Sequence, residues 1–446
     1  MFGKTKLFSF ILILTAFVLA GCKQQEQATD QRGLRLPESP LLTFLEHKSG
    51  LIAYVGSDGN VYTVNQTGKN PAQITDDAAV EGDSQRYYQY PTWSPDSKSL
   101  TFFSLSGSDQ SDLETAIYVA DDDGQNKVEV YKADDGSRPV YLSWSPDSAN
   151  ITFIATIAGS SGLSFNMVPA AGGEIQVLDT GSPYYWDWRP DGSGMFIHAG
   201  GARTADPLAR LSFLSLADGV VEDGLLLKPA TFQSPAFSPD GARLLLAAEN
   251  ADGKNALLLT DLSGEIQNEL TTFETSVAFD WSPDGKQVAF IHSTEASFTV
   301  GKLNLVDADD PTKLVEVDQE DIVAFYWSPD SKKVAYFVPV RAPVTDSSGQ
   351  PTQDTQLILK MYVADAITGK STLLWTFVPT QEFLQTMLFF DQYARSSTIW
   401  SPDSQNLVVP IFLPDESAAG IILVPASGNV QPRFLQQGTM AFWSWK

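Results

Sequence analysis

The chain has 446 residues and carries 54 Asp and Glu against 29 Lys and Arg, so its formal net charge is −25. This acidic balance argues against a nucleic-acid partner, because binding phosphates needs a clustered basic surface. With 43% hydrophobic residues the chain can bury a large core. One Cys and three His exclude an intrachain disulfide and argue against a Cys-rich or His-rich metal site, so we expect no metal and no other cofactor.

The first 21 residues have the order of a secretory signal peptide. Lys4 and Lys6 precede an apolar run over residues 7–18 that is short for a membrane span, which needs roughly 20 residues. An uncleaved N-terminal anchor helix is the alternative. The sequence Leu-Ala-Gly-Cys at residues 19–22 resembles the bacterial lipobox. This resemblance implies cleavage before Cys22 and acylation of its thiol.

These features predict an extracytoplasmic lipoprotein. We expect residues 1–21 to be the signal peptide and Cys22 to anchor the chain in membrane lipid, on the periplasmic or outer side of a membrane. Residues 22–40 are polar and predict a flexible tether.

One tetrapeptide, an aromatic residue followed by Ser-Pro-Asp or Arg-Pro-Asp, recurs seven times. The aromatic residues of this motif are Trp93, Trp144, Trp188, Phe237, Trp281, Trp327 and Trp400. Pro and Asp suit the centre of a type I turn, and the Gly or Ser that follows suits a left-handed position. Each motif therefore predicts a strand, a tight turn and a second strand. We interpret the motif Asp residues as turn formers and the motif aromatic residues as core.

The residues after each motif alternate in the pattern of a half-buried strand. The positions seven and nine residues beyond each motif aromatic are all apolar, as in Leu100 and Phe102 or Val334 and Tyr336. A third apolar strand and a fourth, more polar one follow. Four antiparallel strands in about 45 residues indicate the blade of a β-propeller, in which blades stack around an axis.

The repeats resemble those of the TolB-like β-propeller family over roughly residues 50–446. This resemblance implies an all-β propeller and a protein-interaction scaffold in the cell envelope. It names no ligand, because propellers carry many unrelated activities.

The two ends of the repeat region complement each other. The segments 51–55 and 60–64 match the second and third strands of a blade, and no motif precedes them. Trp443 and Ser444 match the start of a motif within the apolar segment 439–445. We therefore expect the C-terminal strand to pair with the first blade and to close a ring of eight four-stranded blades over residues 41–446. Seven blades, with residues 41–44 as the first strand, is the alternative.

The interval between Trp327 and Trp400 is 73 residues, longer than the others. Residues 343–355 predict an extended hairpin loop, and residues 379–393 predict a helix with Thr380 as its N-cap. We expect this helical insertion near residues 380–395 to pack on the outer wall or on a face of the propeller. A lid, a partner-binding helix and a membrane contact are the alternatives. Its apolar stripe consists of Phe383, Leu384, Met387, Leu388 and Phe390.

No enzymatic site stands out. The Gly-x-Ser-x-Gly motif of an α/β-hydrolase does not occur. His198 and His292 differ by one in their distance from the preceding motif, so strand alternation points them to opposite faces. The acidic cluster at residues 121–123 is predicted to form a turn between strands rather than a calcium site. We therefore expect no catalytic residue and no enzymatic activity.

Aromatic and Arg side chains gather where the innermost strands begin, at one end of the expected channel. Such residues anchor interfaces and stack on sugars and peptides. Acidic neighbours are Asp187, Glu320 and Asp321, and strand alternation will bury about half of the set. The candidate binding residues are Arg86, Tyr87, Tyr88, Tyr90, Arg138, Tyr141, Tyr184, Tyr185, Phe232 and Arg395.

The function predicted from the sequence is a non-catalytic binding or scaffold module for a protein, peptide or glycan in the bacterial cell envelope. Two alternatives remain open. One is a propeller-type enzyme, such as a polysaccharide lyase or a hydrolase, and the other is a structural spacer.

Overall fold

The computed structural model describes residues 50–446, except 83, 109–112, 134–135, 217–220, 232, 294–298, 319–320, 346–350 and 414–417. The chain divides into two units, Met1–His47 and Lys48–Lys446. The expected signal peptide, Cys22 and the tether lie outside the described residues. Within those residues, every helix is too short or too polar to traverse a bilayer.

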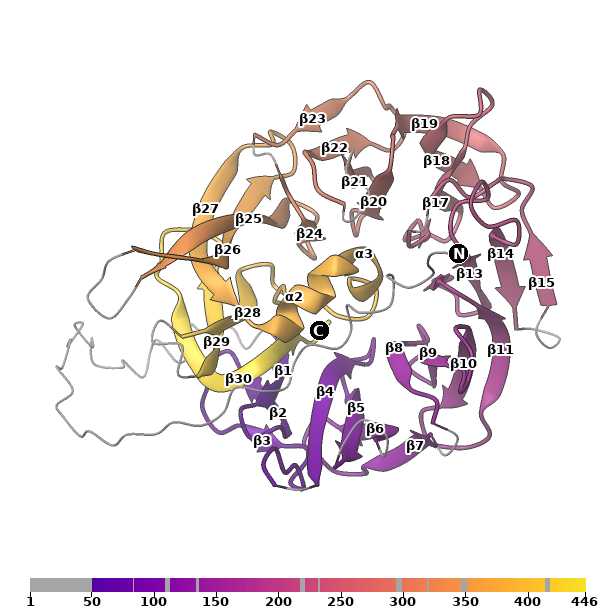
Figure 1. Cartoon of the computed structure of the whole chain (residues 1–446). Helices are drawn as coiled ribbons and strands as arrows, with labels where there is room; N and C mark the ends of the chain where they lie inside the picture. Colours follow the sequence, from indigo (N-terminus) through magenta and orange to yellow (C-terminus); the bar gives the residue numbers. More distant parts are fainter. Residues whose placement is uncertain are drawn as a thin grey trace, which may run out of the picture. The chain divides into compact units, whose positions relative to one another are not determined.

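Five of the repeats form separate four-stranded antiparallel sheets whose strands follow chain order. Figure 1 shows these sheets side by side around a common centre. The sheets are β4 (Gln85–Trp93), β5 (Ser99–Gly107), β6 (Glu114–Asp121) and β7 (Val128–Lys132); β8 (Pro139–Trp144), β9 (Asn150–Thr156), β10 (Leu163–Pro169) and β11 (Gln176–Gly181); β12 (Tyr184–Trp188), β13 (Gly194–Ala199), β14 (Arg210–Ser215) and β15 (Val221–Gly224); β16 (Ala236–Phe237), β17 (Arg243–Glu249), β18 (Asn255–Asp261) and β19 (Ile266–Thr272); and β20 (Ser276–Trp281), β21 (Gln287–Ser293), β22 (Leu303–Asp307) and β23 (Leu314–Glu316).

The remaining strands form one ten-stranded sheet in which two strands change partners along their length. β27 leaves β26 and pairs with β28 at Val378, and β30 leaves β29 and pairs with β1 from Gly438 onward. The ten strands are β24 (Ala324–Trp327), β25 (Lys333–Thr345), β26 (Pro351–Asp365), β27 (Ser371–Pro379), β28 (Asn406–Phe412), β29 (Ala419–Pro425), β30 (Arg433–Trp443), β1 (Leu51–Gly56), β2 (Val61–Asn65) and β3 (Ala72–Gln73).

The C-terminal strand pairs with the first described strand. Trp443 lies opposite Ile52, and Ala441 lies opposite Tyr54. The pairing continues past the strand end, because the backbone N–H of Leu51 donates to the Ser444 hydroxyl at 2.9 Å. This is the pairing that the isolated Trp-Ser near the end of the sequence predicted.

The motif turns are built by their own side chains. In all six Ser-Pro-Asp copies the Ser hydroxyl donates to the Asp carboxylate over 2.5 to 2.8 Å. In the first copy, the Asp96 carboxylate also accepts a hydrogen bond from the backbone N–H of Lys98. These contacts confine the Asp side chains to the turn, as the sequence indicated.

The motif tryptophans join neighbouring sheets. The indole N–H of Trp144 donates to the carbonyl of Thr92, and that of Trp400 donates to the carbonyl of Tyr326 at 2.9 Å. In both cases the acceptor stands one residue before the motif aromatic of the preceding repeat. Trp93 makes the same bond to the carbonyl of Phe442, the residue before Trp443. The C-terminal strand thus occupies the position of a motif strand beside β4.

The core lies between adjacent sheets. Phe196 in β13 packs edge-on against Phe237 in β16, with ring centroids 6.4 Å apart. Val408 in β28 belongs to the same buried cluster as Ile52 and Trp443. Burial of apolar side chains on both faces explains why middle strands such as β17 and β18 are almost continuously hydrophobic, whereas fourth strands such as β7 and β19 are polar and largely exposed.

Candidate functional site

A helical insertion interrupts the innermost strand position of the repeat that contains Trp400. The chain reaches this position at Pro379, which pairs with Ile411, and returns to it at Trp400, which bridges to Leu407. Between them lie α2 (Gln381–Leu388) and α3 (Phe390–Tyr393). The predicted helix and its cap are confirmed, since the Thr380 hydroxyl accepts a hydrogen bond from the backbone N–H of Phe383.

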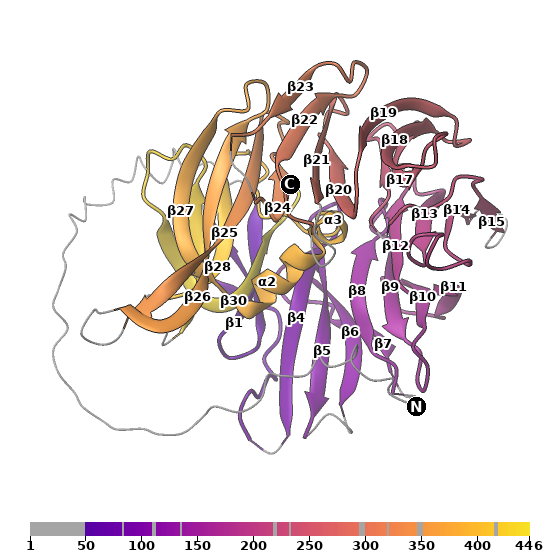
Figure 2. The same cartoon turned by 45° about the horizontal axis from the view of Figure 1, so that its top comes forward.

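The insertion packs against the innermost strands of several sheets. Phe390 meets Phe325 of β24 with ring centroids 5.0 Å apart, and Tyr393 stacks on Tyr90 of β4 at 5.5 Å. The Tyr141 hydroxyl of β8 donates to the carbonyl of Gln392 at 2.8 Å. Both views place α2 and α3 at the centre of the sheets (Figures 1 and 2). Of the two expected positions, the outer wall or a face of the propeller, the outer wall is therefore wrong, because the insertion leaves from an inner strand and packs against other inner strands.

Polar bonds fix α3 to β12 and to the segment that precedes β16. The Gln392 side chain accepts from the backbone N–H of Trp186 and donates to the carbonyl of the same residue at 3.1 Å. The Asp391 carboxylate accepts from the backbone N–H of Ser234 at 2.9 Å. Gln392 and Asp391 are both buried. The insertion is consequently held as firmly as a core element.

Arg395, which follows α3, lies in a buried cluster of carboxylates. Its guanidinium contacts Asp280 at 2.9 Å and Asp187 at 4.0 Å, and its side chain is only 13% exposed. Burial raises the pKa of Asp187 to about 6, although Arg395 and the backbone N–H of Phe237 oppose that shift. Burial likewise raises the pKa of Asp280 and of Asp391. The single Arg395 cation thus lies close to several buried carboxylates.

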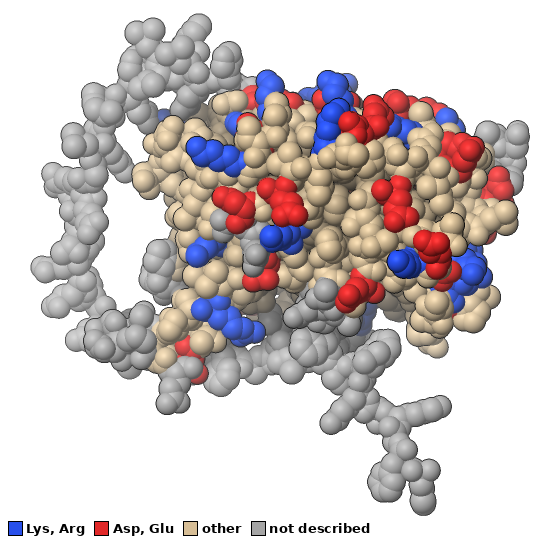
Figure 3. Space-filling view, turned by 90° about the horizontal axis from the view of Figure 1, so that it is seen from above, with Lys and Arg blue, Asp and Glu red and all other residues tan. Residues whose placement is uncertain are grey.

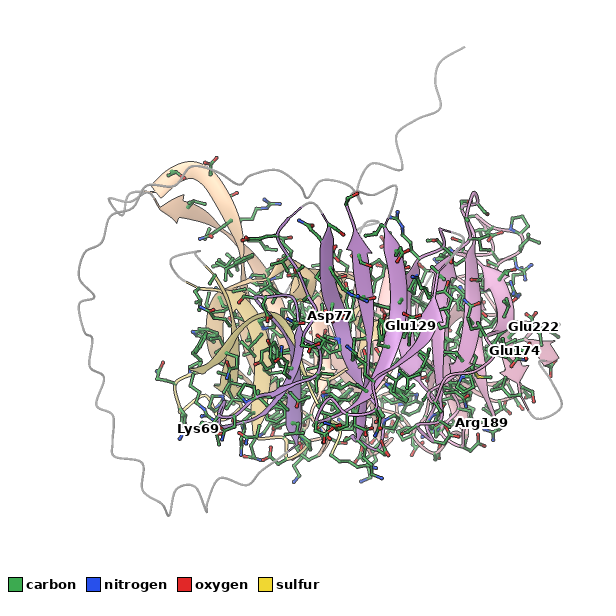
Figure 4. All side chains as sticks on the ribbon, turned by 90° about the horizontal axis from the view of Figure 1, so that it is seen from below. Lys69, Asp77, Glu129, Glu174, Arg189 and Glu222 are labelled. Atoms are coloured by element: carbon green, nitrogen blue, oxygen red, sulfur yellow. The ribbon has the colours of Figure 1, made fainter. Side chains whose placement is uncertain are left out.

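Four of the predicted binding residues are buried and inaccessible to a partner. Tyr88 and Tyr184 donate their hydroxyls to Asp77 and Asp179 at 2.6 and 2.8 Å, while Tyr141 and Tyr185 lie beside the insertion. Asp77 is labelled in Figure 4. Strand alternation predicted that only about half of the set would be buried, but the consecutive residues Tyr184 and Tyr185 are both buried. Tyr184 lies in a core cluster, and Tyr185 lies near Asp391 of the insertion.

The other predicted residues are partly exposed or lie outside the described residues. Arg86 forms an ion pair with Asp77 at 3.1 Å, and Arg138 is half-buried. Tyr90 adopts a left-handed backbone conformation, with φ of 53°, and its hydroxyl donates to Gln385 of α2 at 3.3 Å. Asp321 is exposed. Phe232 and Glu320 lie outside the described residues.

Tyr87 lines an open pocket of about 150 Å³ between β1, β4, β30 and the start of α2. Glu382 of α2 also lines the pocket, and its pKa is raised by burial. Burial, with a smaller contribution from Glu382, raises the pKa of Tyr87. Glu382 was not among the candidate binding residues predicted from the sequence, because a Glu in the first turn of a helix is common for its favourable interaction with the helix dipole alone.

The outer face of α2 is exposed and partly apolar. Leu388 and the adjoining Phe389 are 51% and 48% exposed, whereas Phe383 and Met387 are buried. Leu388 belonged to the stripe that we expected to be covered. The helix instead buries the residues that face the inner strands and presents Leu388 and Phe389 to solvent.

The two described histidines lie in different sheets, His198 in β13 and His292 in β21. The ring nitrogens of His198 lie 3.1 and 3.3 Å from the carbonyl oxygens of Gln233 and Gly201. Burial lowers the pKa of His198 to about 4. Among the described residues, no three His, Cys, Asp or Glu side chains are grouped so that they could hold a metal ion.

Charges of both signs are interspersed on the face shown in Figure 3. Several motif turns carry such pairs: Lys286 lies 3.1 Å from Asp284, and Lys98 lies 3.5 Å from Asp96. Exposed pairs of this kind contribute little to stability.

No protein-family model matches the chain, and a comparison with curated proteins finds no relative. Among solved structures, the chain is similar to a eukaryotic initiation factor at 13% identity, covering 89% of this chain and 98% of the other, with a TM-score of 0.49. It is similar to TolB from Acinetobacter baumannii at 18% identity, covering 61% and 65%, with a TM-score of 0.37, so the match spans less than two thirds of the TolB chain. An oligogalacturonate lyase in complex with manganese matches at 13% identity, covering 66% and 76%, with a TM-score of 0.44. Similarity at this level assigns no activity to the chain.

Proposed function

We propose that the protein is a non-catalytic binding module, an eight-bladed β-propeller that a lipid anchor on Cys22 holds outside the cytoplasm. The β30–β1 pairing and the bond from Trp93 to Phe442 support the eighth blade. The partner is a protein or peptide, with a glycan as the alternative.

The observation that carries this proposal is the exposed face of α2. Leu388 and Phe389 are neighbouring apolar side chains, each about half exposed, on a helix that is otherwise packed into the centre of the sheets. Exposed aromatic and aliphatic groups of this kind serve as interface anchors when a partner covers them. The pocket at Tyr87 and Glu382 lies at the other end of the same helix.

The buried contacts of the insertion make this face rigid before any partner arrives. Tyr141, Trp186 and Ser234, from three separate parts of the chain, all bond to α3. A preformed surface loses little conformational entropy on binding. The way the insertion is held supports a scaffold role for it.

In-cell crosslinking of the anchored protein, followed by partner identification, tests the proposal. The double variant Leu388→Asp with Phe389→Asp is expected to lose a crosslinked species that the wild type gives. Leu226→Asp is the matched control, because Leu226 is fully exposed at a distance in sequence from the insertion. An unchanged set of crosslinked species in the double variant would favour the structural spacer instead.

The lipid anchor has its own test. Cys22→Ser is expected to abolish labelling of the protein by a fatty-acid analogue and to release it into the soluble fraction. Retention of the variant in the membrane would contradict the lipobox interpretation.

The enzyme alternative has one feature in its favour, the raised pKa of Asp187, which would suit a general acid. The Asp187 side chain, however, is only 13% exposed and lies 4.0 Å from the Arg395 guanidinium. A tightly held stoichiometric metal ion in the purified protein, or turnover of a polysaccharide, would favour an enzyme over a binding module.

A further inference from the structure

The pocket beside α2 is formed mainly by residues of α2, β1, β4 and β30, and most of its polar side chains come from three of these elements. Glu382 comes from α2, Tyr87 and Gln89 come from β4, and Thr439 comes from β30. Val55, Val80 and Met440 provide an apolar lining. A small set of polar groups converging on an apolar wall is typical of a site for a small ligand or a side chain.

The Glu382 carboxylate has no counter-ion in the part of the chain that the structure describes. None of the ion pairs between described residues includes it, and Arg86, the neighbour of Tyr87, is engaged by Asp77 instead. No Lys or Arg lines the pocket. Burial raises the pKa of Glu382, because desolvation disfavours the charged carboxylate. A cation bound beside the carboxylate would oppose that shift.

We propose that this pocket binds a primary ammonium group on a short unbranched aliphatic chain, such as the side chain of a partner's lysine. This assignment deepens the proposed binding function and rests on it. An ammonium has three N–H donors, and three of the lining residues, Glu382, Gln89 and Thr439, carry side-chain oxygens that can accept hydrogen bonds. The methylene chain packs on Val55, Val80 and Met440, and the Tyr87 ring favours a cation near its face.

Other cations fit the pocket less well. A single carboxylate supplies too few oxygen ligands for Ca²⁺, which takes six to eight. The planar fork of a guanidinium would pair with the two oxygens of the Glu382 carboxylate alone, whereas the three N–H donors of an ammonium match acceptors carried by separate elements. The net charge of −25 attracts any cation to the surface and therefore gives no selectivity for one cation over another.

The test uses the full-length lipoprotein in detergent, with n-butylammonium as the probe and ligand-observed NMR or calorimetry as the readout. We expect a dissociation constant in the millimolar range for the wild type and at least tenfold weaker binding for Glu382→Gln. The neutral isostere n-butanol is expected not to bind. N-acetyl-lysine amide is expected to bind as n-butylammonium does, which would show that a side chain on a peptide backbone can enter.

Two further variants keep the test independent of folding and net charge. Glu81→Gln removes the same charge from an exposed residue next to Val80 that does not line the pocket, and it is expected to bind as the wild type does. Val80→Trp is expected to block binding by filling the pocket while leaving Glu382 in place. Equal affinity of Glu382→Gln and the wild type, or tighter binding of methylguanidinium than of n-butylammonium, would overturn the assignment.

The outcome is distinguishable from failure of the proposed function. If n-butylammonium binds through Glu382 but the Leu388 and Phe389 variants leave every crosslinked species unchanged, the pocket stands and the partner-binding face does not. If crosslinking depends on Leu388 and Phe389 while the probe does not bind, the pocket assignment alone is wrong.

Discussion

The backbone N–H of Lys446 donates a 3.0 Å hydrogen bond to the hydroxyl of Ser97. Equivalent bonds join successive motif turns: the Asp330 N–H donates to Ser404 at 3.1 Å, and the Asp284 N–H donates to Ser331 at 3.0 Å. Lys446 therefore stands where a motif Asp would stand, three residues after Trp443. The Ser that follows a motif Asp thus not only belongs to its own turn but also accepts a hydrogen bond from the turn of the preceding repeat.

The C-terminal strand is expected to stabilise the whole sheet assembly. Trp443 is fully buried between β1 and its neighbours, so Trp443→Ala is expected to cost about 3 to 5 kcal/mol of unfolding free energy. Trp445→Ala is the matched control, because Trp445 is only partly buried and bonds to the carbonyl of Trp93. Equilibrium urea unfolding measures both. A cost for Trp443→Ala no greater than for Trp445→Ala would show that the end of the chain is dispensable.

The Ser that links two turns also carries backbone strain. Ser404 has φ of 60°, a left-handed conformation that costs an L-residue roughly 1 kcal/mol relative to Gly. Ser404→Ala loses the acceptor for Asp330 and keeps the strain, so it is expected to be destabilised by about 1 to 2 kcal/mol. Ser404→Gly loses the same bond but relieves the strain, so it is expected to be the more stable of the two. The reverse order in urea unfolding would refute this account.

His198 is expected to make stability depend on pH. Its pKa is lowered from 6.5 to about 4, so the folded protein keeps it neutral while the unfolded chain protonates it below 6.5. Its contribution is therefore present above pH 6.5 and lost as the pH falls toward 4. The unfolding free energy of the wild type minus that of His198→Gln should therefore increase by roughly 3 kcal/mol as the pH is raised from 4 to 6.5. A difference that stays flat between pH 4 and 6.5 would count against a buried neutral histidine.

The buried guanidinium of Arg395 is expected to be essential to the insertion. Arg395→Met leaves Asp187 and Asp280 without their cation and is expected to cost about 3 to 5 kcal/mol near neutral pH. Arg189→Met breaks an exposed pair with Asp191 and is expected to cost less than about 1 kcal/mol.

The cost of Arg395→Met is also expected to depend on pH. An acid whose folded pKa is raised loses stability as the pH rises from its unfolded value toward about 6, the folded pKa of Asp187. Acidification below pH 6 neutralises Asp187, so the cost of Arg395→Met should shrink there. Thermal unfolding at pH 5 and pH 7.5 measures the change, and an equal cost at both values would contradict the charge argument.

The sequence predicted the repeating architecture because its evidence is local. A turn such as that of Ser94 and Asp96 forms from residues two apart, and the strand after it is visible as alternating apolar positions. The pairing of Trp443 with Ile52 was predictable for the same reason, since each end of the repeat region carries part of one motif.

The environment of the insertion was not predictable from local patterns. The apolar stripe of α2 showed that one face is buried, but nothing in the pattern identified what covers it. Tyr141, Trp186 and Phe325 meet the insertion from three strands spread over almost 200 residues of sequence. The burial of Arg395 likewise depends on Asp187 and Asp280, which become its neighbours only in three dimensions.

Site-specific photocrosslinking in living cells tests the central claim most directly. A benzophenone amino acid is placed singly at Gln385 and Leu388 of α2 and at the adjoining Phe389. It is also placed singly at the exposed positions Leu208, Leu226 and Ile367, which are distant from α2 in sequence or in element. If the protein binds its partner through the exposed face formed by α2 and Phe389, the same crosslinked species is expected from Gln385, Leu388 and Phe389. That species is expected to be absent from the three control positions. Crosslinks confined to Leu208, Leu226 and Ile367 would contradict it.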